Sequence, residues 1–158
     1  MSDSIPVSGV IPVSEMVGED DEETVRLREL EESARGFLLQ FEWCEAIREF
    51  YFGDGVGDVF GVFLARIEPA KPDIDEYLWI VVGNLPSAYL VIDDSPTPKD
   101  ALEAYIEEMR KWVVLAKRGE HSPDVIPVNV PATPEWAEQL EGRLDALEKE
   151  IIPIWFVQ

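Results

Sequence analysis

The sequence predicts an α+β fold, in which a small, mainly antiparallel sheet of about three to four strands is packed by long amphipathic helices. Apolar residues recur at helical spacing near both ends of the chain, whereas the middle holds short runs rich in Val, Ile and Phe. The length of 158 residues lies within the usual range of one domain. We therefore expect a single domain over residues 19–158, preceded by an arm.

Residues 1–18 form this predicted arm. The tetrapeptide Ile-Pro-Val-Ser occurs twice, at residues 5–8 and 11–14, and its two prolines exclude a helix. Two interpretations are open. The arm is either a flexible or extended leader, or a strand-like segment that docks on a neighbour.

Residues 20–51 carry apolar side chains at intervals of three and four, which predicts one long helix or two helices with a break near Gly36. Acidic residues 20–23 lie at its start, where the helix dipole favours negative charge. Cys44 lies beside Trp43 on the apolar stripe, so we expect a buried core cysteine and no nucleophile. The stripe consists of Leu27, Leu30, Ala34, Phe37, Phe41, Cys44, Ile47 and Tyr51.

Three strands are predicted after the glycines at positions 53, 55 and 57, over residues 59–67, 77–82 and 89–92. Their short connections favour antiparallel neighbours. The first two strands are almost continuously apolar, which indicates that both faces of the sheet are covered.

Two helices are predicted at Thr97-Pro98 and Thr133-Pro134, because each pair joins a hydroxyl cap to a proline at the first helical position. We expect the first helix to end at Gly119 and the second to stop at Pro153. The apolar side of the second helix consists of Trp136, Leu140, Leu144, Leu147 and Ile151. The apolar residues Ile154, Trp155 and Phe156 either pack on the core or mediate a homodimer.

Charge and composition restrict the functional classes. The net charge of -20 disfavours binding to a phosphate backbone, and no apolar run is long enough to span a bilayer, so we expect neither nucleic acid nor membrane as a partner. One cysteine and one histidine allow no internal disulfide and no structural zinc site. With no signal peptide evident, these features predict a bacterial cytoplasmic protein.

The most distinctive stretch is residues 79–89, Trp-Ile-Val-Val-Gly-Asn-Leu-Pro-Ser-Ala-Tyr, in which Gly83 permits a positive φ and Pro86 fixes the exit of a turn. It resembles a bacterial family of domains of unknown function, whose core is a Trp-containing strand, Gly-Asp-Leu-Pro-Thr-Asp-Tyr and a proline-initiated helix with a Trp. The matching residues are Gly83, Leu85, Pro86 and Tyr89, with Trp79 and Trp112 as the aromatic residues, whereas Asn84 and Ala88 replace the two acidic ones. The resemblance covers residues 43–119 and implies the fold, but no reaction.

No phosphate-binding loop, calcium loop or nucleophile–base pair is recognisable in the sequence. We expect a non-enzymatic binding or accessory protein without cofactor or metal, which meets a basic protein partner through surface acid and an aromatic patch. The alternative is a carboxylate-based small-molecule hydrolase, with or without a metal, that uses Asp93, Asp94 and His121. The candidate binding residues are Trp79, Asn84, Tyr89, Asp93, Asp94 and His121.

Overall fold

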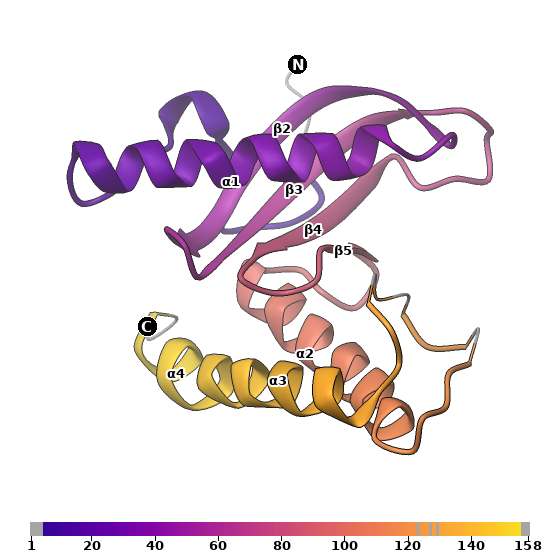
Figure 1. Ribbon diagram of the computed structural model, residues 1–158. Helices are drawn as coiled ribbons and strands as arrows, with labels where there is room; N and C mark the ends of the chain where they lie inside the picture. The colour runs from indigo at the N-terminus through magenta and orange to yellow at the C-terminus, as the bar shows by residue number, and fades with distance from the viewer. Residues whose placement is uncertain (1–4, 123, 127, 129, 156–158) are drawn as a thin grey trace. The chain divides into compact units, whose positions relative to one another are not determined.

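The computed structural model describes residues 5–122, 124–126, 128 and 130–155, and it has the predicted α+β fold (Figure 1). The chain divides into two compact units, Met1–Ala101 with the sheet and Leu102–Gln158 with helices. The boundary falls in the first turn of the helix α2 (Pro98–Ala116). None of the helices within the described residues is long and apolar enough to cross a membrane.

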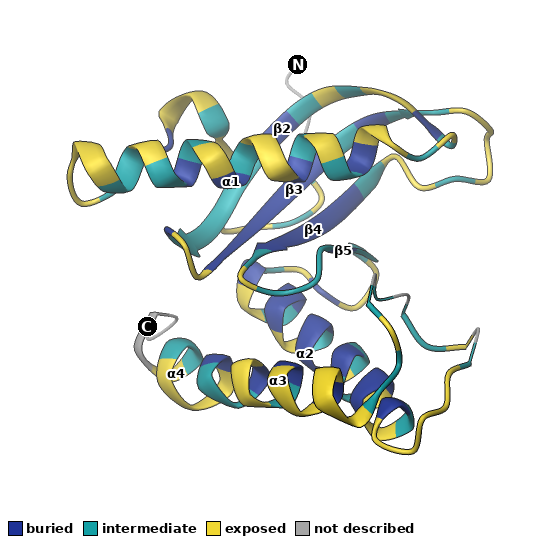
Figure 2. Cartoon of the chain, in the orientation of Figure 1, coloured by how far each residue is buried: buried dark blue, intermediate teal, exposed yellow. Residues whose placement is uncertain are grey.

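The sheet has five strands in the order β1-β2-β3-β4-β5, and the predicted number of three to four was too low. All neighbours are antiparallel, which confirms the antiparallel pairing that the short connections among β3, β4 and β5 predicted. Most residues of β3 and β4 are buried, and the others are partly buried, so both faces of the sheet are covered at its centre (Figure 2). The strands are β1 (Ile11–Pro12), β2 (Cys44–Val56), β3 (Phe60–Pro69), β4 (Tyr77–Gly83) and β5 (Ala88–Val91).

The helix α1 (Asp21–Leu39) packs on one face of this sheet. Its buried side chains lie in one core cluster with Phe63 and Ile80 of the central strands. The side chain of Asp20 caps the helix by accepting a hydrogen bond of 2.8 Å from the backbone N–H of Glu23. The buried residues of α1 are Leu27, Leu30, Ala34 and Leu38.

The predicted helix over residues 44–51 is wrong, because this segment belongs to the strand β2. The pairing of β2 with β3 is interrupted between Cys44 and Ala46 and between Ile47 and Glu49, where β2 holds one extra residue each time. As a result, Cys44, Ile47 and Phe50 face the same core three residues apart. Two bulges thus give a strand the spacing of a helix.

The arm contributes the short strand β1, in which Ile11 pairs with Phe52 and Pro12 with Tyr51 of β2. A 3₁₀ turn (Val13–Glu15) follows, and Met16 behind it is fully buried. Arg28 of α1 donates a hydrogen bond of 2.6 Å to the carbonyl oxygen of Val13. The described part of the arm is therefore strand-like and docks on its own chain.

The second unit is built from α2 and α3 (Pro134–Ala146), which are antiparallel and joined by ion pairs from Arg110 to Asp145 and from Lys117 to Glu141. Both predicted helix starts are confirmed, since Thr97 and Thr133 accept hydrogen bonds from backbone N–H groups three residues later. Gly119, with φ of 70°, ends the helical course of α2.

The predicted stop at Pro153 is wrong, because α3 continues through a π-helical turn (Leu147–Ile151) into α4 (Ile152–Trp155). Proline lacks the N–H that would bond the carbonyl four residues earlier, and the wider turn lies just before it. Phe156 and the side chains of Ile154 and Trp155 lie outside the described residues, so the dimer contact stays a prediction.

Candidate functional site

Four aromatic side chains gather at one end of the first unit, and we call Phe37, Phe41, Trp43 and Tyr89 the aromatic cluster. Phe37 lies near the end of α1, Phe41 and Trp43 in the turn before β2, and Tyr89 in β5. All four residues are half-buried, so each is held by neighbours and keeps part of its surface accessible.

The rings of the aromatic cluster are in direct contact. Phe41 stacks on Trp43 with ring centroids 4.8 Å apart and an interplanar angle of 16°. Tyr89 meets both rings edge-on, with centroids 4.9 Å from Trp43 and 5.4 Å from Phe41, and Phe37 closes the group at 5.2 Å from Phe41. Each such pair contributes about 0.5–1.5 kcal/mol beyond its buried area, so the cluster is preorganised.

Backbone hydrogen bonds fix the turn that presents Phe41 and Trp43. The N–H of Phe41 donates to the carbonyl of Leu38, and the N–H of Cys44 donates to the carbonyl of Phe41, each at 3.2 Å. The carbonyl of Trp43 accepts a bond of 3.0 Å from Ala70, beyond the end of β3. The turn is thus tied to both the helix and the sheet.

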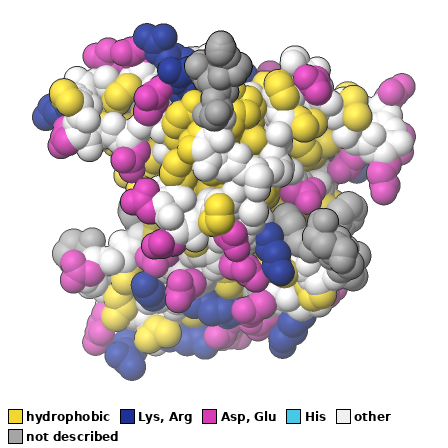
Figure 3. All heavy atoms as spheres, turned by 180° about the vertical axis from the view of Figure 1, so that it is seen from behind, with side chains coloured by type: hydrophobic (Ala, Val, Ile, Leu, Met, Phe, Trp, Pro, Cys, Tyr) yellow, Lys and Arg dark blue, Asp and Glu magenta, His cyan; other side chains and the backbone are white. Residues whose placement is uncertain are grey.

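The unit that carries the aromatic cluster is strongly acidic. The first unit holds 22 of the 33 acidic residues and 7 of the 13 basic ones, a net charge of −15. Glu42 lies between two of the aromatic residues in the sequence, and Glu45 lies two residues after Trp43; both are exposed, and neither forms an ion pair within the described part of the chain. On the face shown in Figure 3, acidic side chains are spread over the surface.

The arginines of the first unit are engaged elsewhere. Arg35 and Arg66 lie over the rings of Phe50 and Tyr77, at 4.6 Å and 5.9 Å from the ring centroids. Arg26 and Arg48 pair with Asp58 and Glu68. Within the described residues no cation–π contact involves a ring of the aromatic cluster.

The predicted site residues occupy different environments. Tyr89 belongs to the aromatic cluster, whereas Trp79 is fully buried and its indole N–H donates a bond of 2.7 Å to the carbonyl of Ser95. Asn84 is exposed in the turn after β4. Asp93 and Asp94 are exposed shortly after β5. Of these five residues of the first unit, only Tyr89 lies in the cluster.

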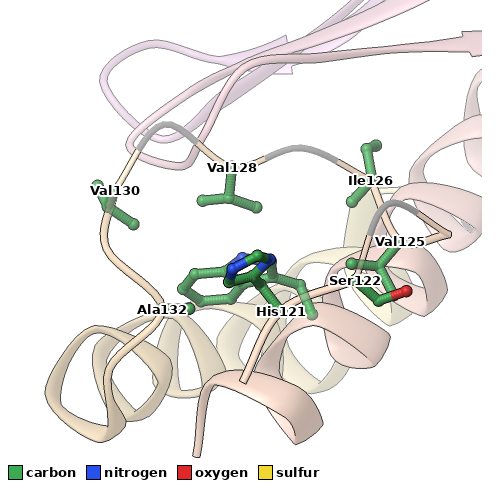
Figure 4. A pocket seen from close by; sticks show the side chains of 8 residues that line it. His121, Ser122, Val125, Ile126, Val128, Val130 and Ala132 are labelled. Carbon is green, nitrogen blue, oxygen red and sulfur yellow. The ribbon is translucent and has the colours of Figure 1, made fainter. Parts of the chain in front are cut away.

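His121 belongs to the second unit, where it lines a hollow of about 370 Å³ (Figure 4). His121 and Val128 face each other across this hollow, and the branched side chains of Val125, Ile126 and Val130 complete much of its wall. The hollow lies in the connection between α2 and α3 and is mostly apolar, with Ser122 as a second polar lining residue.

No donor set for a metal is present among the described residues, since no three His, Cys, Asp or Glu side chains lie close enough to share an ion. Asp93 and Asp94 belong to the first unit and His121 to the second. Cys44 is buried as predicted, and burial raises the pKa of its thiol, which disfavours the reactive thiolate. The hydrolase alternative stays a prediction.

Sequence reasoning missed three members of the aromatic cluster. Phe37 and Phe41 were assigned to the core stripe of one long helix, and Trp43 to its flank. A signal was present in the spacing Phe-x-x-x-Phe-x-Trp. Trp43 follows Phe41 by two residues, so in a single helix its ring would point to the opposite face and the three rings could not align.

Comparison with known proteins adds no relative: no family model, curated protein or solved structure matches the chain.

Proposed function

We propose that this chain is a non-enzymatic binding protein that captures a basic protein partner at the aromatic cluster. The observation that carries the proposal is a preformed group of four half-buried rings on a unit with a net charge of −15. Contact surfaces of proteins are enriched in aromatic residues at their centre and polar at their rim.

The chemistry of the rings favours a cationic partner. The faces of Trp, Tyr and Phe attract Lys and Arg through cation–π contacts, worth about 0.5–1 kcal/mol at exposed sites and more when water is excluded. The cation–π contacts of the described residues lie at Phe50 and Tyr77. The rings of the aromatic cluster are therefore available to a cation of the partner.

The acidic surface supports the same partner by acting at longer range. A strong negative potential raises the association rate of a basic protein and lowers that of acidic ones. Exposed carboxylates such as Glu42 and Glu45 lie next to the aromatic residues in the sequence and would form the acidic rim of the contact. The rings then supply short-range affinity, and the carboxylates supply selectivity.

The test is capture of proteins from a bacterial lysate by the immobilised chain and by Trp43→Ala. We expect Trp43→Ala to lose about tenfold or more of the captured basic protein at 50 mM salt, because removal of an aromatic residue at the centre of an interface costs about 2 kcal/mol. Captured protein should be released at 500 mM salt, since screening removes the attraction of the rim.

Trp136→Ala is the matched control, because Trp136 is 40% exposed on α3 in the other unit. It removes the same side chain from the surface and leaves the aromatic cluster intact. Melting temperatures of both variants must show folded protein. Equal capture by wild type and Trp43→Ala, or equal losses in both variants, would count against the proposal.

A further inference from the structure

The strand β5 is an edge of the sheet. Among the described residues it pairs only with β4, with Leu78 opposite Val91 and Ile80 opposite Tyr89. Its four residues include no charged residue and no proline, which are the usual means of protecting an edge. Val91 is 49% exposed.

The register decides which backbone groups point outward. The N–H of Ile67 donates to the carbonyl of Glu76, and the N–H of Asn84 donates to that of Val59. Because backbone groups alternate along a strand, the even-numbered residues of β4 bond to β3 and the odd-numbered ones bond to β5.

On β5 the same alternation directs Ala88 and Leu90 to β4, and the N–H and C=O groups of Tyr89 and Val91 to the outer side. No other group among the described residues forms a hydrogen bond with these outward groups. The edge therefore offers two donors and two acceptors, spaced for an extended chain.

The side chains of Tyr89 and Val91 lie on the face of the sheet that carries the aromatic cluster. Tyr89 and Val91 lie opposite Ile80 and Leu78, which both belong to the core under α1, so they share that face of the sheet. A strand added along β5 would place every second side chain on the same face, next to the rings of Tyr89 and Trp43.

The opposite edge of the sheet already accepts such a strand. There β1 of the arm pairs with β2, and Pro12, which has no N–H to donate, lies opposite Tyr51. The sheet thus binds an extended segment at one edge by pairing over two residues. The edge at β5 lacks an equivalent segment among the described residues.

We propose that the partner binds by strand addition, with an extended basic segment pairing along the outer side of β5. The inference rests on the proposed function and specifies the partner as an extended chain with Lys or Arg at alternate positions. A second copy of this chain is disfavoured as occupant, because two units of net charge −15 would repel each other. Strand addition is an established mode of peptide recognition in which the backbone gives affinity and alternate side chains give selectivity.

The variant that tests the pairing is Val91→Pro. Proline removes one outward N–H and places its ring in the path of an added strand, and it leaves the bonds of Leu90 to β4 intact. Val91→Ala is the matched control, because it shortens the same side chain and retains the N–H. The probe is an amidated and acetylated peptide of alternating lysine and valine, eight residues long, measured by calorimetry at 50 mM salt.

We expect Val91→Pro to bind this peptide about tenfold more weakly than Val91→Ala, which corresponds to the loss of about 1.4 kcal/mol. The same peptide methylated on every backbone nitrogen keeps its charges and cannot donate, so wild-type protein should bind it at least tenfold more weakly. This second measurement needs no folded variant.

The two proposals fail in different ways. Equal binding of both peptides by wild-type protein, or equal binding by Val91→Pro and Val91→Ala, overturns strand addition and leaves capture by the rings in place. No binding of the unmethylated peptide also overturns strand addition, whereas loss of lysate capture in Trp43→Ala would still uphold the aromatic site.

Discussion

Single residues show how burial changes the chemistry available to this chain. Asp54 in β2 is half-buried, and its carboxylate accepts a hydrogen bond of 2.8 Å from the N–H of Gly55. Burial raises the pKa of Asp54, and this hydrogen bond opposes the rise only in part. Burial likewise raises the pKa of Tyr51 to about 12, helped by its bond to Glu49. These groups resist ionisation because their sites are poorly solvated.

Asp54→Asn should raise the melting temperature at pH 7. A raised pKa means that the folded state binds the proton more tightly than the unfolded state, so the ionised carboxylate costs stability at neutral pH. The cost disappears below the unfolded pKa of about 3.9, and the variant and the parent should then converge. Thermal unfolding between pH 8 and pH 3 measures the difference.

The control for Asp54→Asn is Asp94→Asn, which removes the same charge from an exposed position. It separates the burial of one carboxylate from the general relief of negative charge. A gain for Asp54→Asn no larger than that of Asp94→Asn, or one independent of pH, would contradict the interpretation.

Elements depend on a few positions where backbone geometry is decisive. At the end of β4, Gly83 has a φ of 137°, and a Cβ there would lie 2.4 Å from the carbonyl oxygen of Val59. The neighbouring Asn84 donates to that same carbonyl. The predicted positive φ of Gly83 is confirmed, and its cause is the close approach of two strands. Gly142 in α3, by contrast, has open space around its Cα.

Alanine at these two glycines should act in opposite directions. Gly83→Ala should lower the free energy of unfolding by about 1–3 kcal/mol, through backbone strain and the clash with Val59. Gly142→Ala should raise it by about 0.5–1 kcal/mol, because glycine costs that much inside a helix. Urea denaturation of both variants measures the two changes, and a neutral Gly83→Ala would show that the β3–β4 connection gives way.

The whole molecule is governed by its net charge of -20. Two of the ion pairs that join its elements, Arg26–Asp58 and Lys117–Glu141, involve side chains exposed by a third or more. Exposed pairs contribute about 0–1 kcal/mol each and are screened by salt. Mutual repulsion among the carboxylates is screened by the same salt and acts against folding. With carboxylates in such excess, the repulsion outweighs the pairs.

Salt should therefore stabilise the protein. We expect the melting temperature to rise between 10 mM and 300 mM potassium chloride, as the Debye length falls from about 30 Å to below 8 Å. Scanning calorimetry at several salt concentrations measures this, and sucrose at equal osmolality controls for excluded-volume effects. A fall in melting temperature would mean that ion pairs dominate.

The sequence by itself determined the α+β class, the antiparallel central strands and the starts of α2 and α3. These features depend on local signals: apolar runs, short connections, and the hydroxyl-proline pairs at Thr97 and Thr133. It also determined the burial of Cys44 and the special conformation of Gly83, because each follows from residue type and immediate neighbours.

Only the tertiary structure decided the course of residues 44–51 and the composition of the aromatic cluster. Cys44, Ile47 and Phe50 satisfy helical spacing, and pairing with β3 through two bulges made the segment a strand. Likewise, Tyr89 meets Phe41 and Trp43 only because β5 ends up beside the turn that follows α1. Contacts between residues more than forty positions apart depend on sheet register, and register is set by the packing of the whole core rather than by any local pattern.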